Sequence, residues 1–327
     1  MTDVLVLGGT GWLSGGIARR WLDAGARVTC LARGAREAPY GATLVAADRD
    51  RPDALARVAE RDWDEVVDVS SAPAHVERAL TALAGRTRHW TYISSVSVYA
   101  SADVPGEDES APLADPLEPG EPYDYARAKA SAESAVRRVA GGRAAILRPG
   151  LVVGPGDPSD RFGYWPGRFA LAGAEPVLVP DGRDRFAQVI DVRDLADAVV
   201  ALGRERWVGI ANAVGAPVPL ERLLALARET AGHTGEVVVA DDPWLESHEV
   251  RHWAGPRALP LWLPRDAPGF ATRSHAVYRL LGGAVRDLRV TLADTLADER
   301  ARGLDRDRRS GLTRAEEEVL LAERRAG

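Results

Sequence analysis

The chain has 327 residues, of which 46% are hydrophobic and 28% charged, and 42 basic against 48 acidic side chains give a formal net charge of -6 at pH 7. This composition is typical of a globular protein of one or two domains, and no apolar run reaches the about 18 residues that a membrane span needs. Basic residues alternate with acidic ones instead of forming blocks, so neither nucleic acid nor a membrane is an expected partner.

Apolar runs that predict buried strands alternate with helical patterns through the first half of the chain. Both faces of each run are apolar, and the strands are expected at residues 4–7, 28–31, 44–47, 66–69, 92–94 and 145–147. Helices are expected at residues 16–24, 52–61, 74–84 and 123–140. Since each right-handed crossover lays its helix on a face of the sheet, this order predicts an α/β fold with a doubly wound parallel sheet.

After about residue 155 the alternation becomes irregular. The remaining expected strands are 187–190, 208–213 and 237–240, and the expected helices are 168–172, 195–202, 219–231, 293–302 and 313–325. Thr313 and Glu316 have the spacing of a capping box at the last of these helices. We therefore expect a dinucleotide-binding domain of residues 1–155 plus about 187–215. A smaller, sequence-interleaved substrate lobe is expected at about 156–186 and 216–327.

A glycine-rich segment, residues 8–15 (Gly-Gly-Thr-Gly-Trp-Leu-Ser-Gly), joins the first expected strand to the first expected helix. Glycines there let the backbone approach a pyrophosphate, whose charge is met by the helix N-terminus. Arg33 follows the second strand, where an arginine suits a ribose 2′-phosphate, so NADP(H) is favoured over NAD(H), with Arg36 in support. The alternatives are a plain strand-to-helix turn and a solvated arginine in an arginine-rich chain.

Lys129 is the only lysine in the chain. Arginine and lysine replace one another at little cost on a solvated surface, so a lone lysine marks a position that needs a compact charge, unless it is a chance survivor. Tyr125 precedes it by four residues, and positions i and i+4 share one face of a helix. A nearby ammonium lowers the pKa of a phenol, ordinarily ~10, and makes it usable as an acid–base. A solvated helix face carrying both residues is the alternative.

Five motifs in this order resemble the extended short-chain dehydrogenase/reductases, the NAD-dependent epimerase/dehydratase-like family, over about residues 3–300. They are Gly8–Gly11, Ser95 four residues before Tyr99, Tyr125 with Lys129, the segment 147–156 (Leu-Arg-Pro-Gly-Leu-Val-Val-Gly-Pro-Gly), and the segment 190–196 (Ile-Asp-Val-Arg-Asp-Leu-Ala). Residues 280–282 and 290–296 are similar to the ending of that family.

The resemblance implies a Rossmann-type domain with a nicotinamide cofactor. It also implies Tyr125 as catalytic acid–base, Lys129 as its cofactor-binding partner, Ser95 as the hydroxyl that orients the substrate oxygen, and a homodimer formed through helices of the first domain. The residues expected to contact the cofactor are Gly8, Thr10, Gly11, Trp12, Leu13, Arg33, Asp48, Ser70, Ser71, Lys129 and Pro149.

The sequence departs from the family pattern at three points. Ser14 stands where the third glycine of the loop is usual, so we expect the helix slightly farther from the strand. Ser70 and Ser71 replace the usual His-x-Ala-Ala at the end of the fourth strand. Val96 and Ser97 follow Ser95 where sugar-nucleotide dehydratases carry an acidic pair, so dehydration lacks its usual acid and base.

Several other residues are weaker candidates for a site. His248 and His252 fit a His-Glu-x-x-His pattern, but Arg251 lies between them and no third ligand is evident, so no metal is expected. The candidate substrate contacts are Ser97, Tyr164 and Trp165, with core packing as the alternative for the aromatic residues, Trp244, Trp253 and Trp262 among them. The arginines that could hold an anionic substrate are Arg161, Arg168 and Arg193.

The sequence as a whole predicts an NADP-dependent oxidoreductase that acts on a carbonyl or alcohol of a small metabolite through Ser95, Tyr125 and Lys129. A nucleotide-sugar epimerase with tightly held NAD and a non-catalytic NADP sensor are the alternatives. One cysteine, Cys30, excludes an intrachain disulfide, and the first residues enter a strand without a leader pattern, so we expect a cytoplasmic protein.

Overall fold

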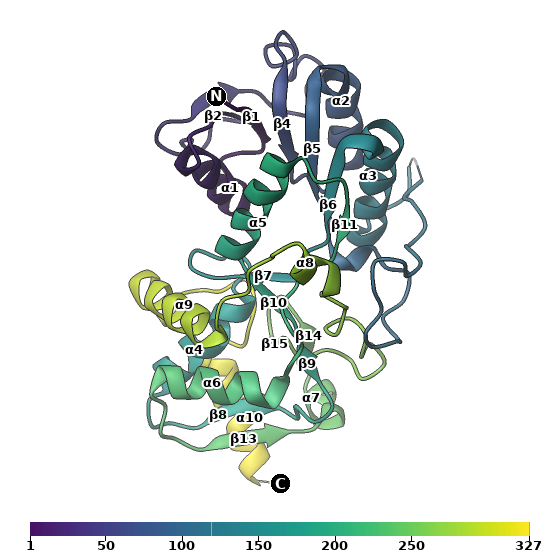
Figure 1. The fold of residues 1–327 in the computed structure, drawn as a ribbon. Coiled ribbons are helices and arrows are strands. Elements are labelled where there is room, and N and C mark those ends of the chain that lie inside the picture. Colours follow the sequence, from purple (N-terminus) through teal and green to yellow (C-terminus); the bar gives the residue numbers. More distant parts are fainter. Residues whose placement is uncertain (119, 327) are drawn as a thin grey trace.

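The central element of the computed structural model, which describes residues 1–118 and 120–326, is a parallel sheet of seven strands (Figure 1). Its strands are β1 (Asp3–Leu7), β2 (Arg27–Ala32), β3 (Thr43–Ala46), β4 (Trp63–Asp68), β5 (Thr87–Ile93), β6 (Ala144–Leu147) and β11 (Gly209–Ala211). Their order is β11-β6-β5-β4-β1-β2-β3, and every pairing is parallel. The order reverses at β1, so the predicted doubly wound sheet of the Rossmann type is confirmed.

Two layers of helices cover the two faces of this sheet. α1 (Trp12–Asp23) and α5 (Val192–Glu205) pack on one face, where Val4 and Val6 of β1 lie in a common core with them. α2 (Pro73–Leu83) and α3 (Tyr125–Ala140) pack on the other face, against Leu5 and Leu7. Successive side chains of β1 thus enter different cores, which is why the strand is apolar throughout.

The helix predicted at residues 52–61 is wrong, because this segment forms a series of tight turns. Most of its backbone hydrogen bonds reach back three residues, as from Ala56 to Asp53 and from Val58 to Leu55. The Trp63 indole donates to the Val58 carbonyl at 2.9 Å, and Leu55 and Val58 pack in the core next to β4. These tertiary contacts override the helical propensity of the segment.

The remaining strands form short pairs below the sheet in Figure 1. They are β7 (Leu151–Val153) with β10 (Val189–Asp191), β8 (Val177–Pro180) with β13 (Val237–Ala240), β9 (Phe186–Ala187) with β12 (Val218–Pro219), and β14 (Arg251–Trp253) with β15 (Ala258–Pro260). The helices here are α4 (Arg161–Ala172), α6 (Leu220–Ala231), α7 (Asp242–Ser247), α8 (Ala276–Leu280), α9 (Leu288–Arg302) and α10 (Arg314–Ala326). Short 3-10 turns, η1 (Ala84–Arg86), η2 (Val96–Val98) and η3 (Gly141–Arg143), complete the described elements.

The C-terminal region has its own hydrophobic core, built on α4, α6, β8 and β13. α4 begins seven residues before the predicted start, although Gly163, Pro166 and Gly167 lie inside it. The two glycines have a packing role, because a Cβ at Gly163 would lie 2.4 Å from Glu299 Oε1 and one at Gly167 2.7 Å from Arg308 Nη2. The glycines that made this segment look like a loop in the sequence therefore allow a close approach between α4 and charged side chains of the C-terminal region.

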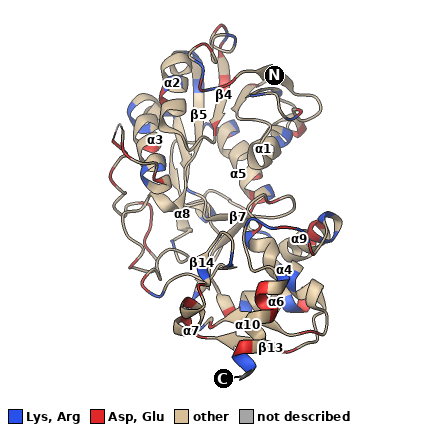
Figure 2. Ribbon diagram, turned by 180° about the vertical axis from the view of Figure 1, so that it is seen from behind, with Lys and Arg blue, Asp and Glu red and all other residues tan. Residues whose placement is uncertain are grey.

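The predicted capping box is confirmed: Thr313 Oγ1 accepts from the Glu316 backbone at 3.2 Å, and the Glu316 carboxylate accepts from the Thr313 N–H at 2.8 Å. No helix among the described residues has the length and apolar character needed to cross a bilayer. Acidic and basic residues are interspersed along the elements of both regions in the view of Figure 2. The domain boundaries given above stay a prediction.

Candidate active site and cofactor cleft

The glycine-rich loop between β1 and α1 is shaped by two close constraints. Gly8 has φ +81°, a left-handed conformation that favours glycine. Gly9 lies so close to β2 that a Cβ there would be 2.6 Å from Cys30 Sγ. A side chain at either position would therefore displace the loop from the end of the sheet.

Ser14 closes this loop on itself. Its hydroxyl donates to the Gly8 carbonyl at 2.5 Å and accepts from the Gly11 N–H at 3.2 Å. The next two N–H groups, those of Trp12 and Leu13, belong to the first turn of α1, where no acceptor exists within the helix. These two groups and the helix dipole are the features that hold a pyrophosphate in dinucleotide sites.

A cavity of about 640 Å³ extends from this loop along the ends of β2 and β3. Its lining residues are Gly8, Thr10, Gly11, Leu31, Ala32, Arg33, Ala35, Arg36, Ala47, Asp48, Arg49, Asp50 and His75. Arg33 and Arg36 are exposed on it, whereas Arg49 is held by two hydrogen bonds to Asp68 at 2.9 and 2.8 Å. The predicted contacts Thr10, Arg33 and Asp48 therefore share one cavity, which fits the nucleoside half of a dinucleotide.

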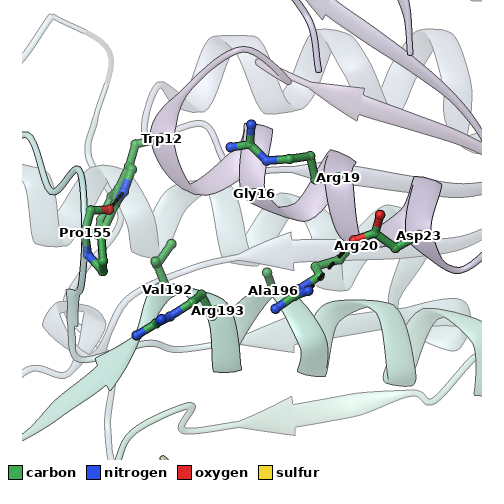
Figure 3. A pocket seen from close by; sticks show the side chains of 9 residues that line it. All are labelled: Trp12, Gly16, Arg19, Arg20, Asp23, Pro155, Val192, Arg193 and Ala196. Carbon is green, nitrogen blue, oxygen red and sulfur yellow. Dashed lines mark hydrogen bonds and ion pairs between the residues drawn. The ribbon is translucent and has the colours of Figure 1, made fainter. Parts of the chain in front are cut away.

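The side chain of Trp12 is not part of the lining of this cleft and lies beside Pro155 and Val192 in another cavity (Figure 3). Its indole donates to the Pro155 carbonyl at 2.8 Å and lines a second cavity, of about 290 Å³, between α1 and α5. Leu13 packs at the edge of the core beneath α1. Of the predicted cofactor contacts, Trp12 and Leu13 can therefore contribute their backbone N–H groups, but not their side chains.

Lys129 of α3 reaches under the ends of β4 and β5. Its buried ammonium donates to the carbonyls of Ile93, Ser70 and Val69 at 2.6, 3.0 and 3.4 Å. A Cβ at Gly8 would lie 3.6 Å from the Val69 side chain, so Lys129 and the cofactor loop meet at one edge of the sheet. Burial lowers the pKa of Lys129 to about 8, against the opposing charges of Asp68 and Glu133.

Ser95 and Tyr125 lie beside Lys129 on the substrate side. Ser95 follows β5 and is buried; its hydroxyl donates to Ser97 Oγ and accepts from the Ser97 N–H, both at 3.1 Å. Tyr125 begins α3, where Asp124 caps the helix by accepting from the Arg127 N–H at 2.8 Å. Tyr125 as a whole residue is 45% exposed, so a substrate can approach it.

The electrostatic surroundings of Tyr125 differ from the expectation based on the sequence. Partial burial raises the pKa of the phenol, and the Ser95 hydroxyl and the positive charge of Arg161 lower it in part. Arg161 begins α4 in the C-terminal region. The cation that lowers the pKa of Tyr125 is therefore Arg161 and not Lys129, which the sequence predicted. The Lys129 ammonium is instead directed at the three strand-end carbonyls.

A buried ion pair ties α3 to the ends of β5 and β6, and sequence reasoning missed it. Arg148 and Glu133 are 1% and 0% exposed, and they share two hydrogen bonds between guanidinium and carboxylate. Glu133 also accepts from the Ser94 hydroxyl at 2.9 Å, and Arg148 donates to Tyr99 Oη at 3.0 Å. Glu133 is four residues after Lys129 and so lies on the same face of α3, but no local sequence pattern links it to Arg148.

Other predicted residues have more local roles. Ser70 Oγ accepts from the Ala72 N–H at 3.2 Å just after β4, next to Ser71, and the Pro149 carbonyl accepts from the Val96 N–H at 2.9 Å. Tyr164 and Trp165 are 1% and 0% exposed inside the C-terminal core. Both side chains therefore pack in the core, which was the alternative to a substrate contact.

The two histidines of the His-Glu-x-x-His pattern do not share a helix face. His248 ends α7 and stacks on Trp244 at 4.0 Å between ring centroids, while His252 lies in β14 and stacks on Trp262 at 3.6 Å. The described part of the chain contains no group of His, Cys, Asp and Glu that could hold a metal ion. The His-Glu-x-x-His pattern therefore does not form the single helix that carries two zinc ligands on one face.

The chain belongs to the NAD dependent epimerase/dehydratase family, whose model matches residues 4–212. It is thus an NAD(P)-dependent oxidoreductase of the extended short-chain dehydrogenase/reductase type. A dTDP-6-deoxy-L-talose 4-dehydrogenase (NAD(P)(+)) of Kitasatospora kifunensis is 28% identical over 314 residues, covering 87% of this chain and 94% of that protein.

Solved structures of epimerases share the fold at low sequence identity. The UDP-Glc/GlcNAc 4-epimerase from Campylobacter jejuni superposes with a TM-score of 0.70 at 14% identity, covering 92% of this chain and 100% of that chain. The UDP-N-acetylglucosamine 4-epimerase from Bacillus cereus gives 0.66 at 15% identity, covering 93% and 100%. The arrangement of the sheet and the C-terminal region is therefore that of the family.

Proposed function

We propose that this enzyme transfers a hydride between NADP and a carbon of a nucleotide sugar, interconverting a hydroxyl and a carbonyl group. The observation that carries the proposal is the convergence of Ser95, Tyr125 and Lys129 at the ends of β4 and β5, beside the glycine-rich loop. The name of the talose 4-dehydrogenase relative supports a sugar linked to a nucleoside diphosphate. Val96 and Ser97, which follow Ser95 in place of an acidic pair, favour simple oxidation and reduction over dehydration.

The residues of the site divide the chemistry among them. In the reductive direction Tyr125, which is protonated at neutral pH like any phenol and whose pKa burial raises further, gives its proton to the substrate oxygen. The Ser95 hydroxyl turns from Ser97 to the same oxygen and stabilises the charge that develops on it. Lys129 and the N–H groups at the start of α1 hold the cofactor, which supplies or accepts the hydride when bound. In the oxidative direction Tyr125 accepts the proton from the alcohol.

The preference for NADP rests on the two exposed arginines of the cofactor cleft. Arg33 directly follows β2, at the strand end where the ribose of the adenosine half is recognised in this type of fold. Arg33 and Arg36 form no ion pair with the described residues, whereas Arg49 is paired with Asp68. A ribose 2′-phosphate would therefore meet two guanidinium groups that form no ion pair in the described chain, with the Asp50 carboxylate within electrostatic reach of Arg33.

The proposal is tested with purified enzyme, NADP⁺ and dTDP-6-deoxy-L-talose, by following the absorbance of NADPH. We expect turnover in the wild type and its loss by about 10²–10⁴-fold in Tyr125→Phe, with the affinity for NADPH unchanged. Tyr40→Phe removes a fully exposed hydroxyl and is the matched control, expected to keep full activity. Full turnover in Tyr125→Phe would refute the mechanism, and NAD that stays bound through purification would favour an epimerase.

A further inference from the structure

Arg161 is the feature of the substrate side that the mechanism above does not use. It is the first residue of α4, and its guanidinium carbon lies 5.0 Å from the centre of the Trp253 ring of β14. Its Nε donates to Ser159 Oγ at 3.2 Å, which fixes the plane of the group. The side chain is thus held by residues of two segments that are far apart in the sequence.

The positive charge of Arg161 has no ion-pair partner among residues 1–118 and 120–326. Asp160, the adjacent residue, accepts from Arg302, Arg306 and the Arg309 N–H. Asp157 accepts from the N–H and the hydroxyl of Ser159, both at 2.8 Å. The Nη1 and Nη2 groups of Arg161 have no acceptor on the described residues either. Burial lowers the pKa of Arg161, and the charge of Asp157, which reaches Arg161 through the Ser159 hydroxyl, offsets this only in part.

The other two arginines considered as anion ligands are already occupied. Arg168 forms a buried ion pair with Glu317 of α10. Arg193 pairs with Asp191 at 2.8 Å and with Asp294 at 2.6 Å. Arg161 is therefore the member of this set whose guanidinium is available to a ligand.

Arg161 also interacts electrostatically with Tyr125, the proposed acid–base. Its charge lowers the pKa of Tyr125, and Tyr125 in turn raises that of Arg161, so the two side chains are within electrostatic reach of each other. A guanidinium with two free N–H edges binds a planar carboxylate or a phosphate through paired hydrogen bonds, and a ring stacked on its face leaves those edges open.

We propose that Arg161 is a specificity-determining residue that binds an oxyanion of the substrate, a phosphate or a carboxylate, beside Tyr125. The inference rests on the proposed function for the identity of the reacting group, but the oxyanion contact is a binding property in its own right. A nucleotide sugar offers two sources of such a group, the diphosphate linker and a carboxylate on the sugar ring. Arg161 selects substrates that carry the oxyanion over neutral analogues.

The test measures binding by isothermal titration to the NADP-loaded enzyme, with two pairs of probes. UDP against uridine reports a contact with the diphosphate, and UDP-glucuronate against UDP-glucose reports a contact with a ring carboxylate. In Arg161→Gln we expect the preference for the charged member of one pair to fall about 10- to 100-fold, as for a lost charge-assisted contact. Arg161→Lys, which keeps the charge but not the planar fork, should lie between the wild type and Arg161→Gln.

Arg300→Gln removes an exposed arginine of α9 without an ion pair in the described chain and is the matched control. If Arg161→Gln matches this control in both pairs while remaining folded by circular dichroism, the inference is wrong. NADPH binding and Tyr125-dependent turnover are measured on the same samples. Turnover without any effect of Arg161 on the preferences refutes the inference alone, whereas an effect of Arg161 in an enzyme that does not turn over refutes the proposed function alone.

Discussion

Replacement of Glu133 by glutamine should destabilise the protein strongly, because it leaves Arg148 charged and buried. Arg148 is 1% exposed, and of its partners only Glu133 is an anion; Tyr99 Oη and the Glu109 carbonyl accept from it at 3.0 and 3.1 Å. Breaking a buried pair by neutralising one member costs about 3–5 kcal/mol. We expect a loss of this size in the free energy of unfolding, measured by urea denaturation followed by far-ultraviolet circular dichroism.

The matched control for this variant is Glu77→Gln. Glu77 of α2 pairs at 3.9 Å with Arg138 of α3, the helix that also carries Glu133. Both side chains are more than half exposed, so the loss of this ion pair should cost at most about 1 kcal/mol. The double variant Glu133→Leu/Arg148→Met should regain much of the lost stability, because apolar residues of similar volume replace both charges. A loss below about 1 kcal/mol in Glu133→Gln would refute the assignment of a buried, mutually dependent pair.

Three further predictions concern the cofactor loop and the acid–base. Gly9→Ala should lower the free energy of unfolding by about 1–3 kcal/mol in thermal denaturation and weaken NADPH binding, since the new Cβ would lie 2.6 Å from Cys30 Sγ. Unchanged NADPH binding would contradict the close approach of Gly9 to β2. Arg33→Ser should weaken NADPH binding about tenfold or more in fluorescence titrations and leave NADH binding unchanged, and an equal loss for both would remove the 2′-phosphate assignment. The rate of reduction should be constant near neutral pH and fall above pH about 8, where Lys129 loses its proton. The rate of oxidation should rise with pH as the Tyr125 phenol is deprotonated. Opposite slopes of the two pH–rate profiles would contradict these pKa directions.

Lys129 also links stability to pH with a definite sign. Its pKa in the folded chain, about 8, is below the ~10.4 of an unfolded lysine, so between these values the unfolded chain binds the extra proton. The Lys129 contribution to the free energy of unfolding should therefore rise with pH in this window, by at most about 1.4 kcal/mol per pH unit, and be constant below it. Urea denaturation of the wild type and Lys129→Met at neutral and alkaline pH measures this difference, and a difference independent of pH would contradict the burial of the charged ammonium.

The sheet and most of its helices were predictable because their signals are local. Two-sided apolar runs identified β1, β2, β6 and the ends of β4 and β5, since a parallel strand covered on both faces is mostly apolar. The starts of β4 and β5 were missed because they carry the buried polar pair Glu65 and His89. Gly8 to Gly11 and the Tyr125–Lys129 spacing are likewise local patterns. The wrong helix at residues 52–61 and the missed start of α4 show the limit, because contacts from Trp63, Glu299 and Arg308 decide both segments.

The sequence by itself determined the fold class, the place of the glycine-rich loop and the residues proposed for the acid–base chemistry, because each depends on residues within one turn, one helix or one strand. The tertiary structure decided which charges meet. Among many arginines it pairs Arg148 with Glu133 and Arg168 with Glu317, and it leaves Arg161 unpaired near Tyr125. Ion pairing depends on distances between side chains that the chain brings together from remote positions, and no local pattern of an arginine-rich sequence specifies those distances.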